Sequence, residues 1–372
     1  MRESELIDKI ARAFRYRAEV SEEVRLGIGD DAALFLPRSR HEMIFTCDWF
    51  LEGTHFLREK HPPDSLGWKC LARAVSDIAA MGGVPRCFLL SLALPDTDTG
   101  RWLDEFLAGL GRASRKFGCV LAGGDTTCRR EISINVTAVG EVQAGRAVVR
   151  SGAGPGELIY VSGRLGEAEL GLEVLRQSRG LGNPKNPLTK KHLYPEPRLA
   201  LGQWVRAKRL ASAMMDLSDG LSSDLSRLCA ASGVGACLER GRIPCLGNPD
   251  LARKRGLDPL RLALHGGDDY ELLFTVSPRK NKLLPRAFRG LPLTPIGTIT
   301  KQSTLVLRDE NGREQLLTAG GWDPFRKGVK AVSGSPKAAG LRRSARSCRK
   351  HSGASAALGM NPGTTTAARG AS

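Results

Sequence analysis

Apolar residues near the start of the chain recur at the spacing of one helix face. They predict a helix over residues 4–16 whose buried face consists of Leu6, Ile7, Ile10, Ala11 and Phe14. A second helix is expected to be capped by Asp64 or Ser65 and to end at Gly82-Gly83, and a third is expected from residue 99 to near Gly118. Short strands are predicted at residues 33–36, 43–46, 119–122 and 132–139.

A glycine-rich break at residues 152–156 predicts a domain boundary after Arg150. Beyond it, strands are expected at residues 158–161, 213–215 and 270–276, helices at 167–177, 198–207 and 221–231, and a proline-rich connector at 183–197. This alternation indicates a mixed α/β (α+β) fold with two domains, residues 1–150 and 151–325. The pattern leaves the strand order open.

The composition is that of a globular protein, with 372 residues, 41% hydrophobic and 26% charged. No apolar run approaches the roughly 18 residues of a membrane span, and the N-terminus has no signal-peptide pattern, so a cytoplasmic protein without a membrane partner is expected. The nine cysteines form no Cys-x-x-Cys pair. They are expected to be reduced thiols, and a zinc site is not expected.

The net charge of +17 raises the question of a nucleic-acid partner. Ten Lys/Arg and no Asp or Glu lie in residues 326–372, a basic tail without apolar periodicity that is predicted to be disordered. A solvated extension without a partner is the favoured interpretation of this tail. Binding of RNA or another anionic surface through the tail is the alternative, and nucleic acid is otherwise not expected as a partner.

Six short acidic segments, most of them built on glycine, are interpreted as turns next to apolar strands. They are Gly27-Ile28-Gly29-Asp30-Asp31, Thr46-Cys47-Asp48, Ser76-Asp77, Gly123-Gly124-Asp125-Thr126-Thr127, Met215-Asp216-Leu217-Ser218-Asp219-Gly220 and Gly266-Gly267-Asp268-Asp269-Tyr270-Glu271. Carboxylates gathered in a folded core repel each other, and Mg²⁺, which takes carboxylate and hydroxyl oxygens, would relieve that repulsion. Because Mg²⁺ also leaves positions that substrate phosphates fill, a metal-dependent phosphate enzyme is expected.

Several common phosphate-binding motifs are excluded. The chain has no Gly-x-x-x-x-Gly-Lys-Ser/Thr loop, no protein-kinase loop set and no Gly-x-Ser-x-Gly nucleophile elbow. The segment from Gly27 to Ala32 superficially resembles a dinucleotide-binding turn. It places two carboxylates where a pyrophosphate would meet bare backbone amides, so a dinucleotide site is rejected.

The acidic segments, together with Glu52-Gly53-Thr54-His55-Phe56 and Arg150-Ser151-Gly152-Ala153, resemble those of thiamine-monophosphate kinases in order and spacing from about residue 3 to Phe325. The resemblance implies the two-domain fold of the aminoimidazole-ribonucleotide synthetase superfamily. It implies a homodimer in which ATP binds near the interface between N-terminal domains. It also implies ATP-dependent phosphorylation of thiamine monophosphate to thiamine diphosphate.

Site residues are carried over from this family position by position. The resemblance implies Mg²⁺ ligands at Asp31, Thr46, Cys47, Asp48, Asp77, Asp125, Asp216 and Asp219. It implies ATP contacts at Gly124, Asp125, Arg150 and Ser218, and contacts with thiamine monophosphate at His55, Asp268 and Trp322. Cys47 departs from the family, which has a hydroxyl residue there, and a thiol is a poor Mg²⁺ ligand, so its backbone carbonyl is the alternative contact.

Purely structural roles remain open for several of these residues. Asp216, Ser218 and Asp219 could cap the following helix, and Asp30 could hold its turn rather than bind metal. His55 could be a core histidine, Trp322 a packing anchor and Arg150 a surface arginine. The costly position of Asp77 in an apolar helix favours metal binding there.

The expected chemistry is a direct in-line transfer in which positioning and charge neutralisation replace acid–base catalysis. The acceptor phosphate oxygen is already ionised near neutral pH, so no general base and no phosphorylated enzyme are required. Two alternatives are kept. One is another ATP-using enzyme of the superfamily with a different small acceptor, and the other is a nucleotide- or RNA-binding protein on a degenerate scaffold.

Overall fold

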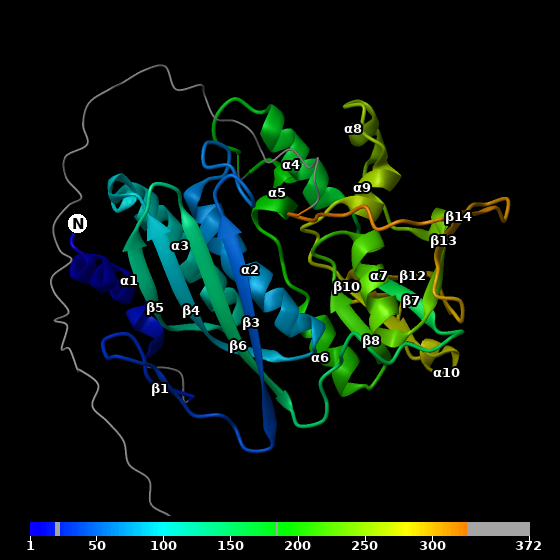
Figure 1. Ribbon diagram of the computed structural model, residues 1–372, viewed down its shortest axis with the longest axis horizontal. Coiled ribbons are helices and arrows are strands. Elements are labelled where there is room, and N and C mark those ends of the chain that lie inside the picture. The colour runs from blue at the N-terminus through cyan, green and yellow to red at the C-terminus, as the bar shows by residue number, and fades with distance from the viewer. Residues whose placement is uncertain (19–22, 184, 326–372) are drawn as a thin grey trace, which may run out of the picture. The chain divides into compact units, whose positions relative to one another are not determined.

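The computed structural model describes residues 1–18, 23–183 and 185–325, and the predicted basic tail of residues 326–372 lies outside the described residues. Within these ranges the chain forms a mixed α/β fold with one sheet from each half (Figure 1). None of the described helices is both long enough and apolar enough to span a membrane.

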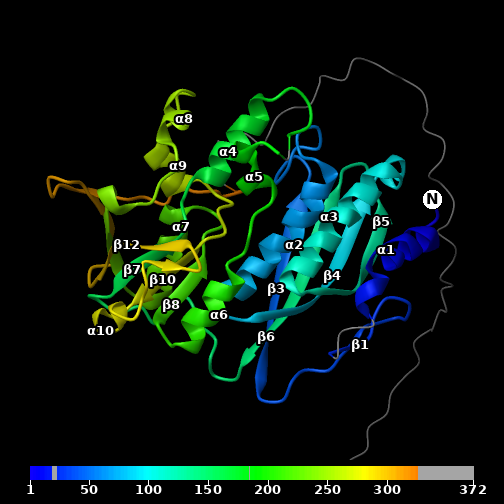
Figure 2. The ribbon, with the colours of Figure 1, turned by 180° about the vertical axis from the view of Figure 1, so that it is seen from behind.

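The first half contains a four-stranded sheet in the order β3-β6-β4-β5. Its strands are β3 (His41–Leu51), β4 (Val84–Leu94), β5 (Val120–Cys128) and β6 (Ser133–Gln143), and a separate pair consists of β1 (Val24–Leu26) and β2 (Leu34–Phe35). The helices are α1 (Glu3–Ala18), α2 (Pro63–Ala80) and α3 (Arg101–Phe117), with a 3₁₀ turn η1 (Asp96–Asp98). Helices α2 and α3 cover one face of the sheet, as the two opposite views show (Figures 1 and 2).

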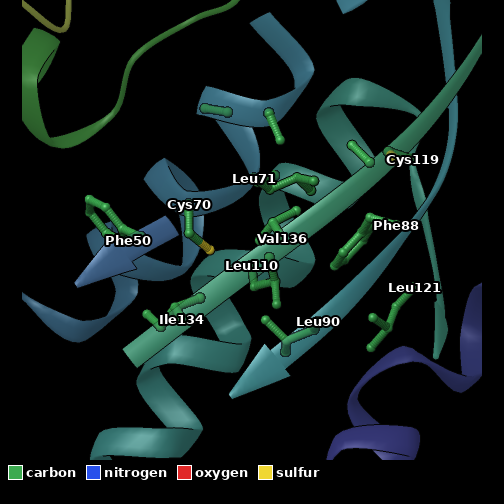
Figure 3. Packing of buried hydrophobic residues seen from close by; sticks show 14 of the residues in the cluster. Phe50, Cys70, Leu71, Phe88, Leu90, Leu110, Cys119, Leu121, Ile134 and Val136 are labelled. Carbon is green, nitrogen blue, oxygen red and sulfur yellow. The ribbon is translucent and has the colours of Figure 1, made fainter. Parts of the chain in front are cut away.

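Alternation along the strands builds the core between this sheet and its helices. Inward-facing side chains such as Phe88 and Leu90 of β4 pack with Ile134 and Val136 of β6 and with Leu71 of α2 (Figure 3). The same alternation turns the intervening side chains of β3 and β4 to the other face, where Phe45, Trp49 and Leu89 are exposed. This second surface is named here the open sheet face.

The second half contains a sheet whose strands pair in the order β14-β13-β9-β12-β7-β10-β8, with β11 pairing with β12 off this path. The strands are β7 (Leu158–Ser162), β8 (Ala211–Asp216), β9 (Gly235–Glu239), β10 (Leu272–Val276), β11 (Ala287–Phe288), β12 (Leu291–Thr300), β13 (Leu305–Arg308) and β14 (Glu314–Leu316). The helices are α4 (Glu167–Gln177), α5 (Pro187–Leu193), α6 (Leu199–Ala207), α7 (Leu221–Ser232), α8 (Pro249–Arg253), α9 (Pro259–His265) and α10 (Pro278–Asn281), with η2 (Arg240–Arg242) as a further 3₁₀ turn.

Two apolar clusters cover the two faces of this second sheet. Ile159 and Val161 of β7 share a cluster with side chains of α7 and α9. Tyr160, which points the other way, shares a different cluster with Leu201 of α6 and with Ala80 at the end of α2. Helix α2 therefore packs on elements of both halves, and its last turn lies where they meet.

Four local predictions are wrong. Ser76-Asp77 is not a turn but lies within α2, near its C-terminal end. Residues 46–48 and 123–127 are not turns but lie within β3 and β5, where pairing with β6 and β4 supplies the backbone hydrogen bonds that a turn would lack. Helix α2 starts at Pro63 after Pro62 and has no side-chain cap, because Asp64 instead binds Arg112 and Tyr194. The proline-rich connector contains α5, which Asn186 caps by accepting a hydrogen bond from the Leu188 N–H.

Candidate functional site

The last turn of α2 meets β3 through a hydroxyl and a carboxylate. Thr46 and Asp48 lie on the face of β3 that packs toward α2, and the Thr46 hydroxyl donates a short hydrogen bond to Asp77. Burial raises the pKa of Asp77, against the opposing effects of Thr46 and the cations Arg150 and Arg73. Arg150, predicted as an ATP contact with a surface role as the alternative, is exposed, and its charge acts on Asp77.

A further carboxylate comes from the end of β8. Asp216 is buried and accepts a hydrogen bond from Ser76 Oγ of α2 at 2.6 Å. Its pKa is raised by burial and by the charge of Asp77. Burial likewise raises the pKa of Asp48 to about 6, with Arg73 opposing the shift and Asp77 and Asp219 adding to it. Asp48 also adds to the shift of Asp216, so both carboxylates are affected by charges of the same set. Asp48, Asp77, Asp216 and Asp219 are named here the four-carboxylate group.

The loop between β8 and α7 is held by a residue that the sequence analysis did not select. Asp224 Oδ2 accepts hydrogen bonds from the N–H groups of Ser218, Asp219 and Gly220 at 3.1, 3.0 and 3.1 Å. Gly220 is the N-cap residue and the helix has no side-chain cap, so the capping alternative for Asp216, Ser218 and Asp219 is wrong. The Asp219 side chain accepts instead from Arg227 at 2.5 Å.

Two residues predicted to bind the acceptor contact each other beside this loop. The rings of His55 and Trp322 have their centroids 6.5 Å apart, and the backbone N–H of Trp322 donates to the Asp219 carbonyl at 2.9 Å. His55 Nδ1 accepts from the Leu51 N–H at 3.1 Å. Burial and the charge of Arg73 lower the pKa of His55 to about 4, so the imidazole is neutral near pH 7.

The third predicted acceptor contact, Asp268, is already paired within the chain. Its Oδ2 lies 2.8 Å from Lys69 Nζ, and its Oδ1 accepts from the Tyr270 hydroxyl at 2.7 Å. Burial alone would raise its pKa, but Lys69 and Arg73 hold the pKa of this carboxyl well below its usual range. Asp268 is therefore ionised, and its charge is shared with two cations of α2.

The other predicted ligands lie elsewhere. Cys47 alternates with Thr46 and Asp48, so its side chain lies on the open sheet face beside Asn135. Its thiol therefore cannot join a cation bound by those two residues. Asp125 is exposed on β5, where its Oδ1 accepts from the Thr126 N–H at 2.9 Å.

Asp30 and Asp31 lie in the loop before β2, and Gly124 lies in β5 against β4. Asp31 is exposed, and its N–H donates to Asp30 Oδ1 at 2.8 Å, which gives Asp30 the turn-holding role that the sequence left open. A Cβ on Gly124 would lie 1.9 Å from the Leu90 carbonyl oxygen of the neighbouring strand. Glycine is thus required there by the close approach of β5 to β4.

The donor set suits a hard cation, although the carboxylates stand apart. Across the described ranges, no three His, Cys, Asp or Glu side chains lie close enough to enclose a metal ion. The raised pKa values of Asp48 and Asp216 express burial and repulsion by other carboxylates, and that of Asp77 expresses burial. Mg²⁺ favours the oxygen ligands that these residues and Thr46 offer, and it would relieve that repulsion.

Sequence reasoning missed Lys69 and Arg73, the two cations of α2. They lie four residues apart in the largely apolar middle of α2, so they share a face, and that spacing is the signal that could have identified them. Lys69 is fully buried against Asp268, and the Arg73 guanidinium lies over the Phe50 ring at 5.4 Å from its centroid. Both bring positive charge to a site otherwise defined by carboxylates.

Comparisons with known proteins agree with this architecture. The models of the AIR synthase related protein match residues 29–142 (N-terminal domain) and 154–310 (C-terminal domain). Thiamine-monophosphate kinase of Escherichia coli (strain K12) is 38% identical over 323 residues, which are 85% of this chain and 97% of that protein. The crystal structure of thiamine-monophosphate kinase from Stenotrophomonas maltophilia K279a is similar with a TM-score of 0.73 and 36% identity, over 85% of this chain and 98% of that chain. A structure described as AaThiL complexed with AMPPCP and TMP is similar with a TM-score of 0.68 and 31% identity, over 86% and 98%.

Proposed function

The chain belongs to the thiamine-monophosphate kinase family, and from this premise we propose that it transfers the γ-phosphoryl group of ATP directly to thiamine monophosphate, in line and with several Mg²⁺ ions. The observation that carries the proposal is the four-carboxylate group at the junction of α2, β3 and β8, where burial and mutual repulsion raise the pKa of Asp48 and Asp216. Such a group fits a reaction that must hold a triphosphate and a phosphate monoester together.

The metal ligands in this proposal are Asp48, Asp77, Asp216 and Asp219, with the Thr46 hydroxyl beside them. Bound Mg²⁺ would supply neutralisation of the phosphate charges. Thr46 and Ser76 hold Asp77 and Asp216 through hydrogen bonds, so the carboxylates are oriented before substrates arrive. Asp31 and Asp125, and the Cys47 carbonyl, remain proposed contacts from the neighbouring loop and strands.

The acceptor is proposed to bind against His55, Trp322 and Asp268. The neutral imidazole and the indole offer flat surfaces for the pyrimidine ring, and ionised Asp268 suits the cationic thiazolium. The backbone N–H of Trp322 donates to the Asp219 carbonyl, which anchors the main chain that carries the indole next to a proposed metal ligand. The acceptor phosphate would then lie toward the four-carboxylate group.

We further propose that ATP contacts Gly124, Asp125, Arg150 and Ser218, and that the protein is a homodimer through the open sheet face. Phe45 and Trp49 are 70% and 56% exposed on this face, which is unusual for large apolar side chains on one sheet. The division into an ATP-binding, dimerising domain of residues 1–150 and a second domain of residues 151–325 belongs to the same proposal. Sedimentation of Trp49→Glu should give monomers, whereas an unchanged dimer would place the interface elsewhere.

The decisive test measures ADP release from Mg-ATP with thiamine monophosphate, and with free thiamine in a parallel reaction. Turnover with the monophosphate alone is the expected result. Strong preference for a different small acceptor would move the chain to another activity of the superfamily. Deletion of residues 326–372 should leave these kinetics unchanged, since no proposed site residue lies in the tail.

A further inference from the structure

Arg73 lies between the two parts of the proposed site. Its charge acts on Asp48 and Asp219 of the four-carboxylate group and on Asp268 on the acceptor side. It also acts on His55, a proposed acceptor contact. The side chain is only 16% exposed, so this cation is enclosed by the site rather than solvated on its rim.

The hydrogen-bonding capacity of Arg73 is largely unused. Its Nε is buried and has no hydrogen-bond partner among the described residues. The carboxylate contact recorded for it, to Asp268 Oδ1, is 3.7 Å long, beyond hydrogen-bond distance, whereas Lys69 binds the same carboxylate at 2.8 Å. Asp268 therefore has its close cationic partner without Arg73. A buried donor left unpaired is costly and fits a position where a ligand supplies the acceptor.

The chemistry of that ligand follows from the surroundings. A planar guanidinium presents parallel N–H groups that match a phosphate in a bidentate contact. A phosphate monoester that approaches four carboxylates is repelled by them, so a fixed cation on its path offsets the repulsion. The Phe50 ring under the guanidinium restricts its orientation.

We infer that Arg73 binds the phosphate group of the acceptor substrate and thereby selects a phosphorylated acceptor over the free alcohol. The inference rests on the proposed function and adds the residue that recognises the acceptor phosphate. Lys69 differs in role, because its ammonium group is committed to Asp268.

The test varies thiamine monophosphate at saturating Mg-ATP, and then Mg-ATP at saturating acceptor, for Arg73→Gln and Arg73→Lys. Loss of a charge-assisted bidentate contact should raise the KM for thiamine monophosphate by about 10-fold to 100-fold in Arg73→Gln, with the KM for ATP changed less than about threefold. Arg73→Lys keeps the charge but not the planar fork, so its KM for thiamine monophosphate should lie between those of the unaltered protein and Arg73→Gln. Arg86→Gln is the matched control, because Arg86 is also 16% exposed with a buried, unpartnered Nε but pairs with Glu23 and Glu141.

The possible outcomes separate this inference from the proposed function. Absence of turnover by the unaltered protein would contradict the proposed function and the inference with it. Turnover by the unaltered protein, together with an unchanged KM for the acceptor in Arg73→Gln, would overturn the inference alone. An equal rise in both KM values would also overturn it, since that is what a structural counter-ion predicts. If Arg73→Gln melts below the assay temperature, calorimetry measures the affinity of Arg73→Lys for thiamine monophosphate and for thiamine. A loss of affinity for the monophosphate alone supports the inference. Equal losses of affinity for both ligands overturn it.

Discussion

Two acidic regions of this molecule look alike in sequence but differ in how their charges are balanced. In the segment Asp268–Glu271, each carboxylate has its own partner from elsewhere in the chain. Glu271 is bound by Arg198 Nη2 at 2.6 Å and Nε at 2.7 Å and by Lys191 at 3.2 Å. Asp269 accepts from the N–H groups of Gly166 and Ala168 at the start of α4.

The four-carboxylate group is balanced less completely. Asp219 pairs with Arg227, but Asp77 and Asp216 accept hydrogen bonds from hydroxyl groups. Burial raises the pKa of both, and repulsion by Asp77 adds to the shift of Asp216. Burial raises the pKa of Asp48 to about 6 and that of Asp216 to about 8, and neighbouring carboxylates add to both shifts. Burial of Glu271 is outweighed by Lys191 and Arg198, so the pKa of Glu271 is lowered. Burial also raises the pKa of Asp269 in the first region to about 6, but there Lys191 and the two backbone N–H groups oppose the shift directly. The regions therefore differ in the direct partners that the chain supplies. The partners of the first region fit a role in stability, and the shortage of them in the second fits the proposed binding of a cation.

Glu271→Gln should give the largest change in stability. Removing this charge leaves Lys191 and Arg198 without their common buried partner, which costs about 3–5 kcal/mol in the free energy of unfolding. Because the pKa of Glu271 is lowered in the folded state, its contribution is full above the ordinary pKa of about 4.5 and is lost as the pH falls through the lower, folded value. Urea unfolding at several pH values measures this. Glu196→Gln, at an exposed glutamate, is the control with little expected change. A small loss in Glu271→Gln would remove the distinction between the two regions.

Asp77→Asn should lower activity strongly and leave stability unchanged or higher, the reverse of Glu271→Gln. Loss of this proposed metal ligand should lower kcat/KM by about 100-fold or more, equivalent to about 2.7 kcal/mol of transition-state stabilisation. The melting temperature without Mg²⁺ should stay the same or rise, because one of several repelling carboxylates is gone. Steady-state kinetics and a thermal scan of the same preparation measure both quantities. Full activity together with a large loss of stability would assign Asp77 to the fold instead.

Mg²⁺ should stabilise the protein more at about pH 7.5 than at about pH 5. The pKa of Asp48 is raised from 3.8 to about 6, so between these values the folded state holds a proton that the unfolded state has released. Stability without metal therefore falls as the pH rises through this window. A bound divalent cation favours the ionised carboxylates, so the rise in melting temperature on adding Mg²⁺ should grow with pH. Equal rises at both pH values would argue against a cation held by this group.

Asp30→Asn should have the smallest effect. Asparagine keeps the side-chain oxygen that accepts from the Asp31 N–H, so the turn is retained and the activity should change less than about threefold. Asp31→Asn, the adjacent and chemically equal change, should lower activity more because Asp31 is the proposed ligand. The same kinetic assay compares the two variants. A larger loss of activity in Asp30→Asn than in Asp31→Asn would make Asp30 the ligand and Asp31 the turn residue.

Sequence predictions are accurate for elements that local signals specify and fail for elements that depend on pairing with distant strands. Helix α4 lies at the predicted residues 167–177 and α3 ends before Gly118 as predicted, because an amphipathic repeat and a left-handed glycine cap are local signals. Strands β3 and β5 run through segments predicted as turns. Their glycines and aspartates have weak strand preference, and pairing with β6 and β4 overrides it.

The sequence by itself determined the α/β class, the resemblance to one kinase family and the identity of the acidic segments, since these depend on residue types and spacing along the chain. Only the tertiary structure decided which carboxylates face one another. Because side chains alternate along β3, Cys47 and Asp48 lie on opposite faces of the sheet. Lys69 and Arg73 of α2 lie against Asp268, about 200 residues away in the sequence. The reason is that charge balance depends on distances between atoms in the folded chain. Acidic residues that look alike in sequence can therefore have entirely different partners.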